Sequence, residues 1–467
     1  MENITYDVRL YKTEVYHGKG VTTYTVRWKA GPKVWRQSFR NKAQADSFQA
    51  ELRTAARKGE AFDITTGRPV AWERAGKDMS WYAFCVSYVD MKWKGSSAKH
   101  RANTAWALVT IMPAMLTTER GKPADKRIRS ALRRWAFNTK NRGECPEDAA
   151  AVLKWVERNT KPVSVLADPK VMRAVLDTAA TRLDGRPAAP STVQRNRAIL
   201  HHACEYAVEL GLLDANPVKT TKWKAPKGSA EVDRRSVVNH TQARRLFDAV
   251  RAQEPSGPRL VAFFAVIYYA GLRPEEAVNL RRENVTLPPL VLNEETGELE
   301  EPVGGWGELH FCTAAPEVGA EWTDDGARRE QRRLKGRGQG EWRRVPVPPP
   351  LTRILRRHLA DIGTGPGGRL FWGVRGGELS TITYRRAWDK ARRAALSEAE
   401  YASPLARRVY DLRHACVSTW LNGGVPAPQV AEWAGHSVEV LLRVYAKCID
   451  GQDEAAKRRI EAALRGS

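Results

Sequence analysis

The most apolar stretch of the chain, residues 259–270 (RLVAFFAVIYYA), sets the strongest limit on what the chain can fold into. Apolar side chains occupy nearly every face of a helix drawn over this stretch, so we predict a helix buried inside a domain. The longest apolar run, 260–272, contains two tyrosines and a glycine. It is also shorter than the roughly 18 residues that a membrane span requires. The stretch therefore predicts the core of a globular domain and no contact with a membrane.

The length of 467 residues suggests about three domains, at roughly 150 residues each. Strand-like alternation over 6–16, 22–30 and 33–39, followed by a helix from Asn41 to Gly59, predicts a small sheet-plus-helix domain over 1–65. We expect Tyr24, Trp28 and Trp35 to fill its core together with Phe39. Residues 64–72 are predicted to be a connector.

Residues 73–220 predict a helical bundle, with its clearest helix running from a capping Ser191 to Gly211. The basic, Pro- and Gly-containing segment 219–236 predicts a linker. The third domain, 232–467, combines helices over 241–253 and 259–270, strands and turns over 287–350, and helices again from 376. The predicted fold class is α+β and multidomain, with a mainly helical third domain that carries a small antiparallel sheet. The other helices of the bundle are expected over 80–92, 100–111, 122–138 and 146–158.

The chain carries 77 Lys and Arg against 53 Asp and Glu, a net charge of +24. Such an excess on a folded chain favours a polyanionic partner such as nucleic acid. The alternative is a solvated basic surface in a chain rich in Arg and Ala. A sheet whose outward side chains are basic suits a DNA groove, but an ordinary solvated face explains it equally well. The candidate DNA contacts are Arg27, Lys29 and Arg36 on the sheet, with Lys33 and Arg40 beside them, Arg195 and Arg197 on the last bundle helix, and Lys222 and Lys224 in the linker.

Several chemistries lack their sequence signatures. The six cysteines are scattered without metal-ligand or disulfide spacing, which indicates reduced thiols in a cytoplasmic protein. No phosphate-binding loop, zinc motif or secretory signal is found, and residues 336–340 (GRGQG) fit a hairpin tip better than a nucleotide site. We therefore expect no cofactor and no metal.

Two segments place a single cation where it could meet an anion. In 268–280, Arg273 follows Gly271 on a short turn, and Pro274 is placed to be the first residue of a helix. Taken alone, a salt bridge of Arg273 with Glu275 or Glu276 explains it better. In 331–348, two basic strands flank a Gly-rich tip with Lys335 at its start, and an exposed basic hairpin is the simpler interpretation.

The third segment, 410–445, contains three short helices. Asp411 is placed to cap the first, which ends at Gly423 and Gly424, and Arg413 lies in its first turn. The second ends at Gly435, so His436 lies on a junction just before Ser437 caps the third. On that last helix Tyr445 falls on an apolar stripe, where a core aromatic would be the ordinary interpretation.

Together, Arg273, Lys335, Arg413, His436 and Tyr445, with the phrases AGLRPEE, DLRH and AGHS, resemble the catalytic set of the tyrosine recombinase (phage integrase) family. The resemblance covers about the last 230 residues, extends more loosely to the helical domain, and likens the N-terminal sheet to the arm-binding domain of large phage integrases. The family usually has His three residues before the second Arg, and here that position is Tyr410. A phenol can donate a hydrogen bond but cannot become cationic.

The resemblance implies that Tyr445 attacks a DNA phosphodiester to form a 3′-phosphotyrosyl link. Arg273 and Arg413 would clamp the phosphate and Lys335 would protonate the 5′-oxygen. His436 would act as donor or base, and Glu276 would brace the Arg273 turn. No ATP or metal is required, because the link conserves the bond energy.

The implied partner is double-stranded DNA at attachment sites, bound by a homotetramer in a bacterial cell during integration of a phage or mobile element. A directionality factor for excision is a further candidate partner. The segment after Tyr445 would pack on a neighbouring subunit, or equally well fold back onto its own. The alternative function is a catalytically silent DNA-binding protein on the same scaffold, supported by Tyr410. A metal-dependent nuclease would need clustered carboxylates, which the third domain lacks.

Overall fold

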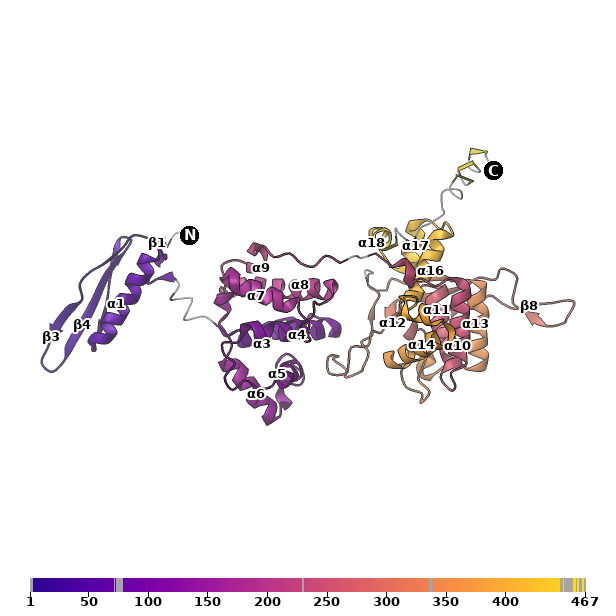
Figure 1. Cartoon of the computed structure of the whole chain (residues 1–467), viewed down its shortest axis with the longest axis horizontal. Helices are drawn as coiled ribbons and strands as arrows, with labels where there is room; N and C mark the ends of the chain where they lie inside the picture. The colour runs from indigo at the N-terminus through magenta and orange to yellow at the C-terminus, as the bar shows by residue number, and fades with distance from the viewer. Residues whose placement is uncertain are drawn as a thin grey trace. The chain divides into compact units, whose positions relative to one another are not determined.

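The computed structural model describes residues 3–70, 72, 79–228, 231–335, 338, 340–445, 448, 457–458, 460–461 and 464–465 (Figure 1). The chain divides into two compact units, one comprising 1–96 with 100–227 and the other 228–467 with 97–99. Helices and small antiparallel sheets make up both units. The predicted mixed α and β fold class is confirmed. The separation of the first unit into a sheet domain and a helical domain stays a prediction.

The N-terminal part of the first unit is a four-stranded antiparallel sheet with one helix on it. β4 (Thr22–Ala30) pairs with β2 (Val8–Leu10), β3 (Glu14–His17) and β5 (Lys33–Phe39), so the strand expected over 6–16 is in fact two short strands. α1 (Lys42–Arg57) begins at its predicted cap, Asn41, whose side chain accepts the Ala43 amide. Alternate residues of β4 face this helix: Val26, Trp28 and Ala30 are buried against it, while Tyr24, Trp35 and Phe39 are partly buried.

The opposite face of this sheet carries Arg27, Lys29 and Arg36, as predicted, whereas Lys33 pairs with the buried Ala30 and lies on the helix side, so its predicted outward position is wrong. Arg27 and Arg36 are direct cross-strand partners, and neighbouring residues along a strand alternate between faces. The predicted connector 64–72 is wrong, because this segment packs onto the sheet. β1 (Ile4–Thr5) pairs with β6 (Phe62–Asp63), and the Trp28 indole donates to the Gly67 carbonyl.

The rest of the first unit is helical, as predicted, and residues 169–179 add a helix that the sequence analysis missed. The last long helix begins at Pro190 after an uncapped Ala189, so the prediction that Ser191 caps it is wrong. Pro190 serves as the first helical residue because it lacks the N–H that a cap would have to satisfy. The elements are α3 (Trp81–Trp93), α4 (Ala98–Ile111), α5 (Asp125–Ala131) with a π-helical turn over Leu132–Ala136, α6 (Glu147–Arg158), α7 (Pro169–Ala179), α8 (Pro190–Glu209) and α9 (Pro217–Thr220).

The linker is shorter than predicted at both ends. On its N-terminal side, the Trp223 indole donates to Asp177 at 2.7 Å and Arg173 donates to the Lys222 carbonyl at 2.9 Å. On its C-terminal side, Val232 is buried and its amide donates to the Val444 carbonyl at 2.9 Å. The segment between 224 and 231 therefore remains as the linker.

The second unit is built around α11 (Gly257–Tyr269), which is buried along its length as predicted. α10 (His240–Arg251), α13 (Pro349–Asp361) and α16 (Asp411–Asn422) pack against it, and α14 (Thr381–Ala395) packs against α10. A three-stranded sheet of β7 (Val285–Thr286), β10 (Gly307–Phe311) and β13 (Arg343–Val347) completes the core. The remaining short elements are β8 (Val291–Leu292), β9 (Leu299–Glu300), β11 (Thr313–Ala314), β12 (Arg332–Arg333), α12 (Pro274–Val278) and α15 (Glu398–Ala402).

The basic hairpin predicted over 331–348 is wrong. β12 pairs with β11, whereas β13 pairs with β10, so the two basic strands do not pair with each other. Arg343, the first residue of β13, is buried and does not face solvent. The strands separate because Val345 and Val347 must reach the hydrophobic core on the β10 side.

Two short helices follow α16: α17 (Ala427–Ala434) and α18 (Val438–Tyr445), with Ser437 capping α18 through the Val440 amide. Asp411 is the first residue of α16 and not its cap, since its carboxylate accepts the Arg408 amide and guanidinium. The predicted amphipathic tail after Tyr445 lies largely outside the described residues. No helix in the described ranges is long and apolar enough to cross a membrane.

Candidate active site

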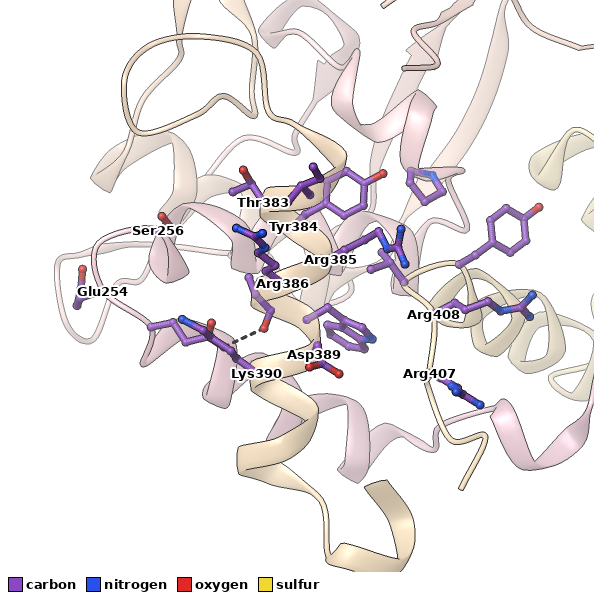
Figure 2. A pocket seen from close by; sticks show the side chains of 17 residues that line it. Glu254, Ser256, Thr383, Tyr384, Arg385, Arg386, Asp389, Lys390, Arg407 and Arg408 are labelled. Carbon is purple, nitrogen blue, oxygen red and sulfur yellow. Dashed lines mark hydrogen bonds between the residues drawn. The ribbon is translucent and has the colours of Figure 1, made fainter. Parts of the chain in front are cut away.

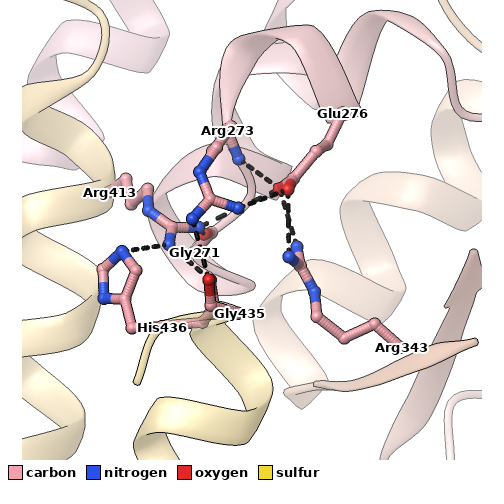
Figure 3. Close-up of polar contacts among 8 residues, drawn as sticks. Gly271, Arg273, Glu276, Arg343, Arg413, Gly435 and His436 are labelled. Atoms are coloured by element: carbon pink, nitrogen blue, oxygen red, sulfur yellow. Dashed lines mark hydrogen bonds and ion pairs between the residues drawn. The ribbon is translucent and has the colours of Figure 1, made fainter. Parts of the chain in front are cut away.

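The turn between α11 and α12 fixes Arg273. Gly271 takes a left-handed conformation with φ of 60°, which ends α11, and Pro274 starts α12 as predicted. Glu276 reaches back to this turn: its carboxylate accepts the Arg273 amide at 2.7 Å and the Arg273 guanidinium at 2.7 Å (Figure 3). The expectation that Glu276 braces the turn agrees with this geometry.

Glu276 is the centre of a buried charge cluster that the sequence analysis did not foresee. Arg343, arriving on β13, donates two hydrogen bonds to the same carboxylate at 2.9 and 2.7 Å (Figure 3). Burial alone would raise the pKa of Glu276, but the charges of Arg343 and Arg273 outweigh it and lower that pKa to about 2. Glu276 is therefore an anion at any physiological pH. The apolar alternation of 343–347 was the available signal that Arg343 lies inside.

Arg413 reaches the cluster from α16. Its guanidinium has no exposed surface and lies 3.9 Å from Glu276. It donates to the carbonyls of Gly271 and Ala434, which belong to the ends of α11 and α17. Three segments far apart in the sequence thus hold one side chain in place. Arg273 is anchored in the same way, by a 2.9 Å bond to the Gly435 carbonyl.

His436 lies on the junction between α17 and α18, beside these arginines. Gly435 before it has φ of 62°, and a Cβ there would be strained and would displace the Arg343 guanidinium, which it would meet at 2.4 Å. The Nε2 atom of His436 is 2.8 Å from Arg413. Burial, then the charges of Arg413 and Arg273, lower the pKa of His436 to about 3, so the ring is neutral.

Three buried polar atoms of this cluster have no hydrogen-bond partner among the described residues: Arg343 Nε, Arg413 Nε and His436 Nδ1. Since Nε2 of neutral His436 accepts from Arg413, Nδ1 carries the ring proton. The two donors on Arg413 and His436, which are in contact with each other, therefore both lack an acceptor. An anion with several oxygens is the ligand that would satisfy both.

Tyr445 is a fully buried aromatic, as its apolar stripe predicts, and it also lies beside this cluster. Its ring centroid is 6.2 Å from that of His436, and its hydroxyl is 2.8 Å from Nδ1 of His414. Burial raises the pKa of Tyr445. Burial, then the charges of Arg408 and Arg413, lower the pKa of His414 to about 4. Neutral His414 therefore accepts the phenol proton in a hydrogen bond, a contact that the sequence analysis missed.

Tyr410 is half-buried at the edge of the cluster. Its ring centroid is 5.0 Å from that of His414 and 5.9 Å from the Arg413 guanidinium carbon. It also lines a groove of about 990 Å³ (Figure 2). Cationic side chains of α14 and of the segment before α16 surround this groove: Arg385, Arg386, Lys390, Arg407 and Arg408.

Lys335 is not brought to the cluster. It is exposed in a turn after β12 and makes no hydrogen bond or ion pair with the part of the chain that the structure describes. Of the predicted DNA contacts in the first unit, Arg195, Lys222 and Lys224 are exposed, while Arg197 is half-buried with a guanidinium nitrogen 3.5 Å from the Val218 carbonyl. Among the described residues no group of three or more His, Cys, Asp or Glu could hold a metal ion.

No family model matches the chain. It is 28% identical over 192 residues to the tyrosine recombinase XerC of Corynebacterium glutamicum, covering 37% of this chain and 60% of that protein. It is 29% identical over 201 residues to the putative integrase/recombinase y4rC of Sinorhizobium fredii, covering 43% of this chain and 48% of that one. The match thus spans about half to three fifths of these curated relatives.

Two solved structures have similar chains at low identity. An integrase of transposon Tn1549 in complex with circular intermediate DNA shows 13% identity and a TM-score of 0.44, covering 69% of this chain and 96% of that one. A lambda integrase dimer bound to a core site shows 13% identity and a TM-score of 0.44, covering 91% of each chain.

The arginines, histidine and tyrosine that the sequence separates by up to 172 positions meet around Glu276. Over this part of its length the chain is similar to the curated tyrosine recombinases.

Proposed function

We propose that this protein is a site-specific DNA recombinase that cleaves and rejoins DNA through a 3′-phosphotyrosyl intermediate. The observation that carries the proposal is the pair of unpartnered buried donors, Arg413 Nε and His436 Nδ1, beside the buried Tyr445. A phosphodiester brings the oxygens that these donors lack. Three arginines against one glutamate leave a net charge of about +2 to meet it, in a site where charge interactions are strong.

The proposed step exchanges one phosphoester bond for another. The Tyr445 oxygen attacks phosphorus, the bond to the 5′-oxygen breaks, and the phenol proton passes to solvent while Lys335 protonates the leaving oxygen. Arg273 and Arg413 stabilise the negative charge that develops on the non-bridging oxygens, and neutral His436 donates from Nδ1. Rejoining reverses these events with a new 5′-hydroxyl, so neither ATP nor a metal enters.

In this proposal the structure around Tyr445 is the inactive state of the enzyme before DNA binds. Arg413 and Tyr445 have no exposed surface, so a phosphate reaches them only after Tyr445 leaves its place in the core. Burial raises the phenol pKa, which keeps Tyr445 protonated and unreactive until then. His414 is too weak a base, at a pKa of about 4, to take the proton, and so acts as a positioning residue.

DNA binding in this proposal is mainly electrostatic. The groove beside Tyr410 presents cationic side chains of α14 next to the site, which suits a phosphate backbone that leads into it (Figure 2). Lys335, exposed on its turn, would reach the leaving oxygen when DNA binds. Arg27, Lys29 and Arg36 would contact arm-type sites, and Arg195, Arg197, Lys222 and Lys224 core sites.

The assembly and setting of the reaction are part of the same proposal. Three domains, 1–65 for arm-type DNA, 73–220 for core DNA and 232–467 for catalysis, would act as a homotetramer on paired attachment sites in the bacterial cytoplasm, associated with the nucleoid. The reaction would integrate a phage or mobile element, with a directionality factor controlling excision. The similarity to curated tyrosine recombinases and the charge of the chain support these proposals.

A nicked suicide DNA substrate carrying the element's junction tests the function. We expect a denaturant-resistant protein–DNA adduct with the wild type and none with Tyr445→Phe, because only the phenol oxygen can form the link. Tyr410→His and Tyr410→Phe then show whether the phenol at 410 contributes. Tight, salt-sensitive DNA binding without any adduct would instead support the silent DNA-binding protein, which the Tyr410 departure favours.

A further inference from the structure

The segment between Arg282 and Arg328 has a charge unlike that of any other part of the protein. Residues 283–327 contain 11 of the 53 acidic residues and none of the 77 Lys and Arg. The rest of the chain then has 42 acidic residues against all 77 cations. A polyanion such as DNA repels this segment. The segment therefore serves something other than the DNA contacts proposed above.

The centre of this segment is a built hairpin. β8 pairs with β9, with Leu292 opposite Leu299. At the tip, Asn293 accepts the Glu295 amide at 2.9 Å and its own amide donates to the Glu298 carbonyl at 2.8 Å. Gly297 completes the turn with φ of 71°. These bonds fix the shape of the hairpin before any partner binds.

The base of the hairpin is held by a helix of the core. Arg356 on α13 binds Glu301 at 2.5 Å and the Pro288 carbonyl at 2.5 Å, one on each side of the hairpin. Figure 1 shows the hairpin extending from the second unit beyond α13. The anchored base presents the hairpin outward and keeps it from folding down onto its own unit.

The hairpin exposes apolar side chains and backbone edges. Leu292 is 62% exposed and its partner Leu299 64%, and Trp306 after the hairpin is 59% exposed. Among the described strands β8 and β9 pair only with each other, so both outer edges are unpaired. An exposed apolar pair on an unpaired two-stranded sheet is the kind of surface that protein partners cover.

We propose that the β8–β9 hairpin docks onto a cationic surface of a second copy of this chain. Charge complementarity selects this occupant. Glu294, Glu295 and Glu298 at the tip would face a protein that carries a large cationic excess, and Leu292 and Leu299 would be buried against it. The two surfaces differ, so the contact is head-to-tail. It does not depend on DNA cleavage.

Sedimentation velocity over a range of protein concentrations, without DNA and at low salt, tests this docking. We expect association of the wild type that weakens with added salt. Leu292→Ser/Leu299→Ser and Glu294→Lys/Glu295→Lys/Glu298→Lys should each sediment as monomers. Leu183→Ser, another exposed leucine, and Glu144→Lys/Glu147→Lys/Glu157→Lys, with the same charge change in the helical part of the first unit, should associate like the wild type.

Two results would overturn the proposal. One is a wild type that stays monomeric at its highest soluble concentration, which leaves the hairpin to another partner. The other is association that the hairpin variants retain. The suicide-substrate adduct of the hairpin variants keeps this test separate from that of the proposed function, because the hairpin lies outside the arginine cluster and the proposed cleavage step uses residues of one protomer. We expect that adduct at the wild-type level.

Discussion

Arginine is used in opposite ways in two regions of this protein. Around Glu276, Arg343 and Arg413 have at most 1% of their side-chain surface exposed, and backbone carbonyls and a carboxylate fix their guanidinium groups. On the outer face of the N-terminal sheet, Arg27 keeps 42% of its side chain exposed and pairs with a Glu14 that is itself exposed. The first set is held in one geometry by groups from separate segments, whereas the second is free to adapt.

This difference separates arginines that can stabilise a reacting phosphate from arginines that only strengthen binding to DNA. A guanidinium held in a buried site acts strongly on a phosphate because water does not screen it and no reorganisation is needed. An exposed guanidinium adds a modest, salt-dependent attraction. Substitutions in the buried cluster should therefore cost more than substitutions on the exposed sheet face.

Glu276→Gln should have the largest effect on folding. It leaves the guanidinium groups of Arg273, Arg343 and Arg413 buried around a neutral side chain, and breaking a buried pair in this way costs about 3–5 kcal/mol. Urea denaturation of the full chain measures the loss in free energy of unfolding. Glu275→Gln, one position away, should change that free energy by less than about 0.5 kcal/mol. Equal losses in both variants would mean that the cluster has no special role.

Arg413→Lys should leave the charge but remove the fixed fork of donors. We expect the rate of adduct formation on the suicide substrate to fall by about 10²- to 10³-fold, because an ammonium cannot hold His436, two carbonyls and a phosphate together. The exposed Arg407→Lys should react at nearly the wild-type rate. A rate for Arg413→Lys within a few-fold of the wild type would remove Arg413 from the proposed clamp.

Acidification should lower the free energy of unfolding at pH values above those at which the carboxylates titrate. The pKa of His414 falls from 6.5 to about 4 on folding, so the unfolded chain binds more protons between these values. The stabilising contribution is complete above pH 6.5 and is lost as the pH falls toward 4, by about 2 kcal/mol at pH 5. The stabilising contribution of Glu276, whose pKa is lowered to about 2, is complete above about pH 4.5 and is lost only below that pH. Denaturation of the wild type and of His414→Gln at pH 7 and pH 5 measures the contribution of His414. An equal pH dependence of the free energy of unfolding in both proteins would contradict the lowered pKa of His414.

Arg27→Ala/Arg36→Ala should have the smallest effect. We expect the variant to bind arm-type DNA more weakly than the wild type by less than about 1 kcal/mol per residue. The slope of the logarithm of the binding constant against the logarithm of the salt concentration should fall in magnitude by about one per lost phosphate contact. Arg53→Ala/Arg57→Ala changes the same charge on exposed positions of α1, which covers the other face of the sheet. If both pairs shift the salt dependence equally, the outer face has no specific role.

Much of the local structure followed from the order of residues. The cap at Asn41, the buried helix over 257–269, the Pro274 start and the three short helices over 411–445 all depend on neighbours in the sequence, so propensity and periodicity could predict them. The basic hairpin over 331–348 was wrong because strand pairing is a long-range choice. Arg343 and His414 were missed because their partners, Glu276 and Tyr445, are 67 and 31 residues away.

The order of residues alone accounts for the resemblance to tyrosine recombinases, the residue types of the site and the turns on which Arg273 and His436 lie, since glycine and proline act locally on the backbone. Only the tertiary structure decided that Glu276 binds Arg273 and Arg343 together, that Tyr445 rests in the core against His414, and that Lys335 stays apart. The physical reason is that burial and charge pairing depend on which distant segments meet. A residue's own neighbours along the chain do not contain that information.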